Sequence, residues 1–147
     1  MLGVTLIELP NHAGSQGRLV ALDKDQSLHF DARRVYVIYD TPMDATRGGH
    51  ATSSNCALVV LSGRVAVDLD NSEEVMTIQL SRPDQALRID AGVWLRLHNF
   101  AEGTIVLVAA SQTYVESVYF EQPQSQLLKN DSAQGEAVMP LCAPRIP

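Results

Sequence analysis

Cysteine, aromatic residues and clustered positive charge are all scarce in this chain of 147 residues. Cys56 and Cys142 are too few for a disulfide framework, and the sequence has no Cys-x-x-Cys or Cys/His cluster that would predict zinc. The arginines are scattered singly in a chain of net charge −6. Nucleic acid and anionic membrane surfaces bind to basic patches, so we expect neither as a partner. One or two arginines suffice, however, to hold a small anion.

Long apolar runs are absent as well. No segment approaches the length of a membrane span, and residues 1–10 lack the basic leader and apolar core of a signal peptide. We therefore expect a cytoplasmic protein. Hydrophobic residues still make up 46% of the chain and aromatic residues only 5%, which predicts a folded protein with an aliphatic core. The length fits one domain.

Short segments of alternating polar and apolar residues, separated by turn residues, follow one another along most of the chain. Such spacing is typical of an all-β sandwich or barrel, and no helix is required before Gln112. The clearest predicted strands are 4–9, 17–23, 34–40, 56–62, 64–70, 74–80, 86–89, 93–100 and 104–110. The last of these is continuously apolar, which predicts a central strand buried on both faces. Residues 114–121 fit a short helix or a strand equally well.

The C-terminal part is polar and interrupted by prolines from Pro123 onward. We expect one domain over residues 1–122 and a tail over 123–147.

The segment from Arg47 to Thr52 lies between two strand-like runs and is rich in glycine and polar residues. Because binding groups often lie on loops or strand ends of a rigid scaffold, this segment is a candidate site rim. A plain glycine-rich connection is the alternative.

Two parts of the sequence resemble the metal-site motifs of cupin barrels. In cupins a histidine pair one residue apart lies on one strand, and a further histidine follows a Pro-x-Gly corner. The corresponding stretches here are Gly49-His50-Ala51-Thr52 and Asp90-Ala91-Gly92-Val93-Trp94-Leu95. Thr52 and Leu95 stand at two ligand positions, and a single histidine does not hold a transition metal. We therefore predict no metal and no cofactor.

A more specific resemblance covers over two-thirds of the chain, in order. The sequence is similar to the cupin family of nucleotide-sugar 3,4-ketoisomerases, which convert dTDP-4-keto-6-deoxyglucose to its 3-keto isomer. The segments that carry the similarity are 17–22, 34–41, 47–51, 58–63, 92–94, 98–100 and 108–111, with Tyr114 and Glu116. This resemblance implies a cupin-like, RmlC-like double-stranded β-helix or jelly-roll barrel. It also implies a nucleotide-sugar substrate and a homodimer.

The resemblance also implies roles for individual residues. Moving a ketone from C4 to C3 requires a weak base that removes the C3 proton, and His50 matches the family's first active-site histidine. Tyr36 matches a pocket tyrosine, which would donate a hydrogen bond to the enediolate oxygen. Arg47 matches the arginine of an Arg-Gly-x-His segment and would support the site or pair with a phosphate. Thr52 and His98 complete the expected set as substrate-binding residues.

The sequence departs from the family pattern at several of these positions. Thr52 replaces the second active-site histidine, Gln16 replaces an arginine, and Leu95 replaces the histidine of a Trp-His-Glu motif. Three hypotheses therefore stay open. The chain is a metal-free 3,4-ketoisomerase, a binding or accessory cupin without turnover, or an epimerase or other isomerase of a related sugar.

Overall fold

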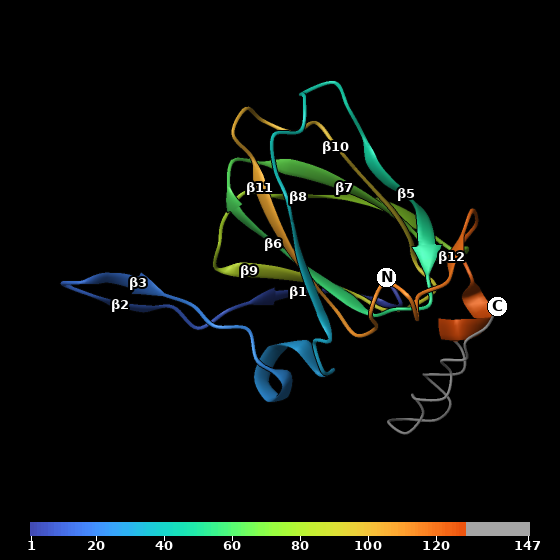
Figure 1. The fold of residues 1–147 in the computed structure, drawn as a ribbon, viewed down its shortest axis with the longest axis horizontal. Coiled ribbons are helices and arrows are strands. Elements are labelled where there is room, and N and C mark those ends of the chain that lie inside the picture. The colour runs from blue at the N-terminus through green and yellow to red at the C-terminus, as the bar shows by residue number, and fades with distance from the viewer. Residues whose placement is uncertain (129–147) are drawn as a thin grey trace.

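Two five-stranded antiparallel sheets make up most of the computed structural model, which describes residues 1–128. The first sheet has the strand order β1-β9-β6-β11-β4 and the second the order β12-β5-β10-β7-β8 (Figure 1). The strands of the first sheet are β1 (Val4–Glu8), β9 (Gln85–Ile89), β6 (Cys56–Ser62), β11 (Ile105–Ala110) and β4 (Arg34–Ile38). Those of the second are β12 (Tyr119–Phe120), β5 (Arg47–Thr52), β10 (Trp94–His98), β7 (Val65–Asp70) and β8 (Val75–Leu80). The all-β prediction is confirmed.

The core lies between the two sheets and consists mainly of aliphatic side chains. On β7, Val65, Val67 and Leu69 are fully buried, as their alternation with Ala66, Asp68 and Asp70 predicts. These side chains meet Leu58, Val60 and Val106 of the first sheet in one continuous cluster. Burial of apolar surface on the inner face of each sheet therefore holds the two layers together.

The outer face of the first sheet is covered by the segment that leads into β4. Leu28 and Phe30 of this segment pack on Ala57 and Ala109. Residues Lys24–Leu28 form a single π-helical turn, η1, in a part of the chain where the sequence required no helix. Asp23 accepts a hydrogen bond from the Gln26 amide at 2.8 Å, and the turn ends at a left-handed residue. Burial of Leu28 and this cap together explain the turn. No helix among residues 1–128 is long and apolar enough to cross a membrane.

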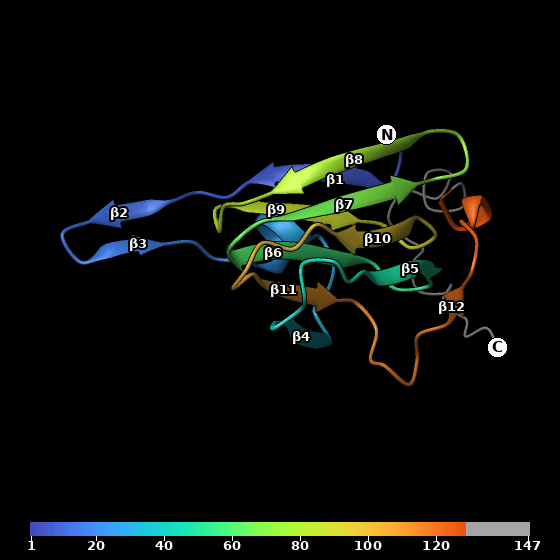
Figure 2. The same ribbon diagram turned by 90° about the horizontal axis from the view of Figure 1, so that it is seen from above.

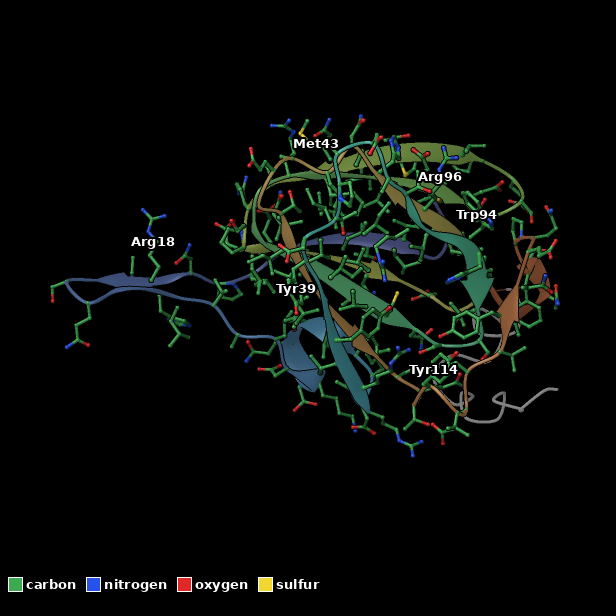
Figure 3. The ribbon with its side chains drawn as sticks, turned by 45° about the horizontal axis from the view of Figure 1, so that its top comes forward. Arg18, Tyr39, Met43, Trp94, Arg96 and Tyr114 are labelled. Atoms are coloured by element: carbon green, nitrogen blue, oxygen red, sulfur yellow. The ribbon has the colours of Figure 1, made fainter. Side chains whose placement is uncertain are left out.

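A separate hairpin projects from the body of the molecule. It consists of β2 (His12–Gly14) and β3 (Gly17–Leu19), and all six of its strand residues are exposed. Figures 1 and 2 show it extending away from the two sheets, and Arg18 in Figure 3 marks its position. The strand expected over 17–23 is therefore shorter than predicted.

The predicted tail begins in contact with the barrel. The Gln124 amide donates a hydrogen bond to the Gly92 carbonyl at 2.8 Å, and Leu128 is buried in the core cluster. Residues 125–128 form a helical turn, whereas the remainder of the expected tail, 129–147, lies outside the described residues. Contacts of the barrel thus extend at least to Leu128.

The candidate rim over Arg47–Thr52 is a strand, β5, and it contains a β-bulge. Its partner β10 pairs Leu95 with His50 but Arg96 with Gly48, so that Gly49 is the additional residue. Gly48 and Gly49 both have positive φ, at 84° and 85°, a conformation that glycine adopts without steric cost. The two glycines therefore allow the bulge that orients the side chains of β5.

Gly48→Ala is expected to destabilise the protein because it places a Cβ in a left-handed conformation, 3.0 Å from the Leu95 carbonyl oxygen. The expected loss in the free energy of unfolding, measured by urea denaturation, is about 1–2 kcal/mol. Gly14→Ala is the matched control, since a Cβ there meets nothing within 4 Å and its φ is not positive. Equal losses in the two variants would contradict the role of the bulge.

Candidate active site

A cavity of about 370 Å³ opens between the two sheets. Its walls come from β4, β5, β6, β10 and β11, and the segment that joins β11 to β12 completes them through Tyr114 and Ser117. Figure 3 shows Tyr114 on this joining segment. Because the cavity is surrounded by paired strands, its side chains are held on a rigid scaffold.

His50 reaches the cavity from β5, where Gly48 and Thr52 also line the wall. Its ring packs edge-to-face on Tyr119, with 4.8 Å between the ring centroids. The Nδ1 atom is buried and has no hydrogen-bond partner among the described residues. Burial lowers the pKa of His50 below its ordinary value of 6.5, and the contribution of its own backbone partly opposes this effect. The imidazole is therefore neutral near pH 7 and able to accept a proton.

Tyr36 reaches the cavity from β4. Burial raises the pKa of its phenol to about 12, and the nearby Cys56 adds to this increase. The phenol consequently stays protonated at neutral pH and can donate a hydrogen bond. Cys56 also lines the cavity, and burial raises the pKa of its thiol to about 12, so it is a neutral thiol and a poor nucleophile.

Two arginines give the cavity its charge. Arg34 and Arg47 line it, and no aspartate or glutamate among residues 1–128 does. The Arg34 guanidinium lies 4.2 Å from the centroid of the Tyr36 ring and 5.2 Å from that of Tyr114. Stacking between two rings fixes the plane of the guanidinium but leaves its N–H edge able to hydrogen-bond. Although the chain is acidic, the cavity is suited to an anion.

Thr52 lines the cavity, but its hydroxyl is engaged in a local turn. Its Oγ1 accepts a hydrogen bond from the Ser54 amide at 2.6 Å. The same hydroxyl donates a hydrogen bond to the Ser54 carbonyl oxygen at 3.4 Å. A Thr hydroxyl that already satisfies the backbone of its own turn is not a free proton carrier. The residue thus offers a small side chain where the resemblance expects an imidazole.

His98 does not line the cavity. Leu95 and Leu97 of β10 do, so the alternation of the strand places His98 on the opposite face, with Arg96. Its Nε2 lies 2.9 Å from Asp68 Oδ1, and Arg96 donates to the other oxygen at 2.7 Å. Burial alone would raise the pKa of Asp68, but hydrogen bonds from Thr77, Arg96 and His98 lower it to about 2. His98 thus belongs to an ion-pair cluster on the outer face, and Arg96 lies apart from Tyr114 in Figure 3.

The structure brings His50, Tyr36, Arg47 and Thr52 to one cavity and leaves His98 outside it. It also adds Arg34 and Tyr119, to which the sequence analysis assigned no role. Arg34 lies two residues before Tyr36 on β4, so the alternation of that strand was a usable signal. Tyr119 had no such signal, because β12 is only two residues long. Among residues 1–128, no group of histidine, cysteine, aspartate or glutamate side chains is arranged to hold a metal ion.

Comparison with solved structures first defines the class. The chain has the fold of the RmlC epimerase of Mycobacterium tuberculosis, with a TM-score of 0.66 at 17% identity over 76% of this chain and 64% of that one. Much closer in sequence is the WlaRB TDP-quinovose 3,4-ketoisomerase of Campylobacter jejuni, with a TM-score of 0.79 at 30% identity, covering 88% of this chain and all of that one. The predicted RmlC-like cupin fold is confirmed.

The particular family follows from the sequence comparisons. Residues 2–129 match the family model described as "FdtA: WxcM-like, C-terminal". The chain is also 35% identical, over 74% of its length, to the TDP-4-oxo-6-deoxy-alpha-D-glucose-3,4-oxoisomerase of Aneurinibacillus thermoaerophilus, of which 78% is covered. The protein belongs to the FdtA family, and the resemblance found in the sequence is confirmed.

Titration of half-buried His50 tests its environment. We expect NMR titration to give a pKa below 6.5, because burial disfavours the imidazolium. The unfolded chain then binds a proton more readily than the folded chain, so stability should decrease as the pH falls through about 6.5. His50→Asn should lose less stability over the same pH range in thermal melts. A His50 pKa at or above 6.5 would contradict this assignment.

Proposed function

We propose that this protein is a 3,4-ketoisomerase of a nucleotide-linked 4-keto-6-deoxyhexose, as its relatives are named. The observation that carries the proposal is a cavity containing a neutral histidine, a protonated phenol and two arginines, to which the described part of the chain adds no carboxylate. A nucleotide sugar supplies the matching groups. Its diphosphate is an anion for Arg34 and Arg47, and its keto sugar carries a removable proton next to a carbonyl.

The proposed chemistry assigns one task to each residue. His50 removes the proton from C3, and the electrons move through a C3=C4 double bond to the oxygen on C4. Tyr36 donates a hydrogen bond to the enediolate oxygen, which stabilises the charge that develops there. The C3 hydroxyl then loses its proton and the C4 oxygen gains one, and return of the carbon proton to C4 forms the 3-keto isomer. This step needs no external oxidant, because C3 is oxidised as C4 is reduced.

The two remaining substrate-binding candidates differ in their support. Thr52 lines the cavity and remains a candidate contact for the sugar through its side-chain surface. His98 has no such support, since it faces away from the cavity and is bound to Asp68. We therefore leave His98 out of the proposed site.

The homodimer and the cytoplasmic location stay predictions. A sedimentation mass equal to one chain would contradict the dimer.

The reaction is testable by solvent exchange. The purified protein, incubated with dTDP-4-keto-6-deoxyglucose in heavy water, should form the 3-keto isomer and incorporate deuterium at C3 or C4, as read by NMR. His50→Asn should abolish both, because the base is lost while the shape of the cavity is kept. If the unaltered protein binds the nucleotide sugar but shows no exchange and no product, it is the accessory cupin instead. A product with an inverted centre and an unmoved ketone would identify an epimerase.

The two arginines should be needed for binding of the diphosphate. We expect Arg34→Met and Arg47→Met each to weaken TDP binding about tenfold or more in calorimetry, because a charged hydrogen bond is lost. Arg64→Met is the control, since Arg64 is exposed and does not line the cavity. Equal affinity for TDP in all three variants would place the diphosphate elsewhere.

A further inference from the structure

The place of the missing second histidine is occupied by a side chain from a neighbouring strand. Tyr119 pairs with Thr52 in the antiparallel register of β12 and β5. Residues directly opposite each other in an antiparallel pair point to the same face of the sheet, and both line the cavity. The small Thr52 leaves room next to His50, and the Tyr119 ring fills it, 4.8 Å from the imidazole centroid.

The phenol of Tyr119 also has an electrostatic partner. Arg34 Nη1 donates a hydrogen bond to the Tyr119 hydroxyl oxygen at 3.4 Å. This contact places the Tyr119 hydroxyl at the side of the cavity that carries Arg34. Stacking on Tyr36 and Tyr114 holds the same guanidinium in place. The arrangement is therefore suited to a phenol that releases a proton and takes it back.

The threonine and serine hydroxyls that line the cavity are bonded to the backbone. Thr52 bonds to the backbone of Ser54, and Ser117 Oγ donates to the Thr113 carbonyl at 2.9 Å. Ser54 Oγ donates to the Asn55 carbonyl at 3.1 Å. Tyr36 is held protonated by burial, so it donates a hydrogen bond but gives up its proton with difficulty. Tyr119 is the cavity phenol that contacts His50 directly.

The isomerisation requires two proton movements, and His50 accounts for one. One proton moves from C3 to C4, and a second leaves the oxygen on C3 while the oxygen on C4 gains one. While His50 carries the carbon proton it is an imidazolium, which cannot also accept the proton of the C3 hydroxyl. A separate group next to His50 is needed.

We propose, on the basis of the function proposed above, that Tyr119 is a catalytic residue that relays the proton between the two sugar oxygens while His50 relays the proton between the two carbons. Its O–H bond breaks as the C4 oxygen is protonated. The phenolate then takes the proton of the C3 hydroxyl as the C3 carbonyl forms. The phenol is restored, and no proton or electron is gained or lost overall.

Two substitutions at Tyr119 test the relay against a packing role. Tyr119→Phe keeps the ring beside His50 but removes the hydroxyl, and it should lower kcat about 100-fold with KM and TDP affinity within about twofold. Tyr119→His changes the ring but supplies a proton carrier, so it should be at least about tenfold faster than Tyr119→Phe. Tyr39→Phe is the matched control, because Tyr39 is exposed and does not line the cavity.

A packing role predicts the reverse order, with the phenylalanine variant the faster of the two. That order, or a Tyr119→Phe variant with a kcat within about threefold of the unaltered protein, would overturn the relay. Active Tyr119→Phe enzyme would leave the ketoisomerase function intact, which separates the two proposals. Absence of turnover in the unaltered protein would overturn the proposed function and the relay with it.

Discussion

The bulged pairing of β5 with β10 determines the direction of the side chains in the cavity. Because the side chains of a strand alternate between its two faces, one additional residue changes which of them point inward. The residue that makes this possible is Gly49, beside a second left-handed glycine at position 48. With the bulge in place, His50 and Thr52 face the cavity, and Arg47 reaches its wall from the start of the strand. The direction in which the site residues of β5 point therefore depends on the backbone conformation at these two glycines.

The charge of the cavity wall is opposite in sign to the net charge of the chain. The protein carries a net charge of −6, yet residues 1–128 contribute two arginines and no carboxylate to the cavity wall. Acidic side chains instead neutralise basic ones on the outer surface, as in the pair of Asp68 with Arg96. Separation of the charges in this way gives an acidic protein a local site for an anion. The composition of the whole chain does not predict that site.

Local patterns in the sequence predicted the strands well, because alternation and turn residues act over a few positions. The three inward residues of β7 and the strand from Arg34 are examples. Such local patterns do not predict which distant strands pair with each other. The outward face of His98 follows once Leu95 and Leu97 are known to point inward, but the sequence alone did not orient β10. Tyr119 lies on a strand of only two residues. No periodicity in the sequence indicates that this strand pairs with β5, some 65 positions earlier.

The shortness of β12 has a mechanical consequence. His50 lies on a strand that is paired on both sides, whereas Tyr119 lies on an edge strand that is paired only to β5. Beyond that ladder, the segment is anchored near this edge by bonds between Ser53 and Val118 and by the contact of Arg33 with Glu116. Fewer backbone hydrogen bonds therefore hold β12 than hold β5. The cavity thus has one wall on a doubly paired strand, which carries the base, and another on a short edge strand, which carries Tyr119.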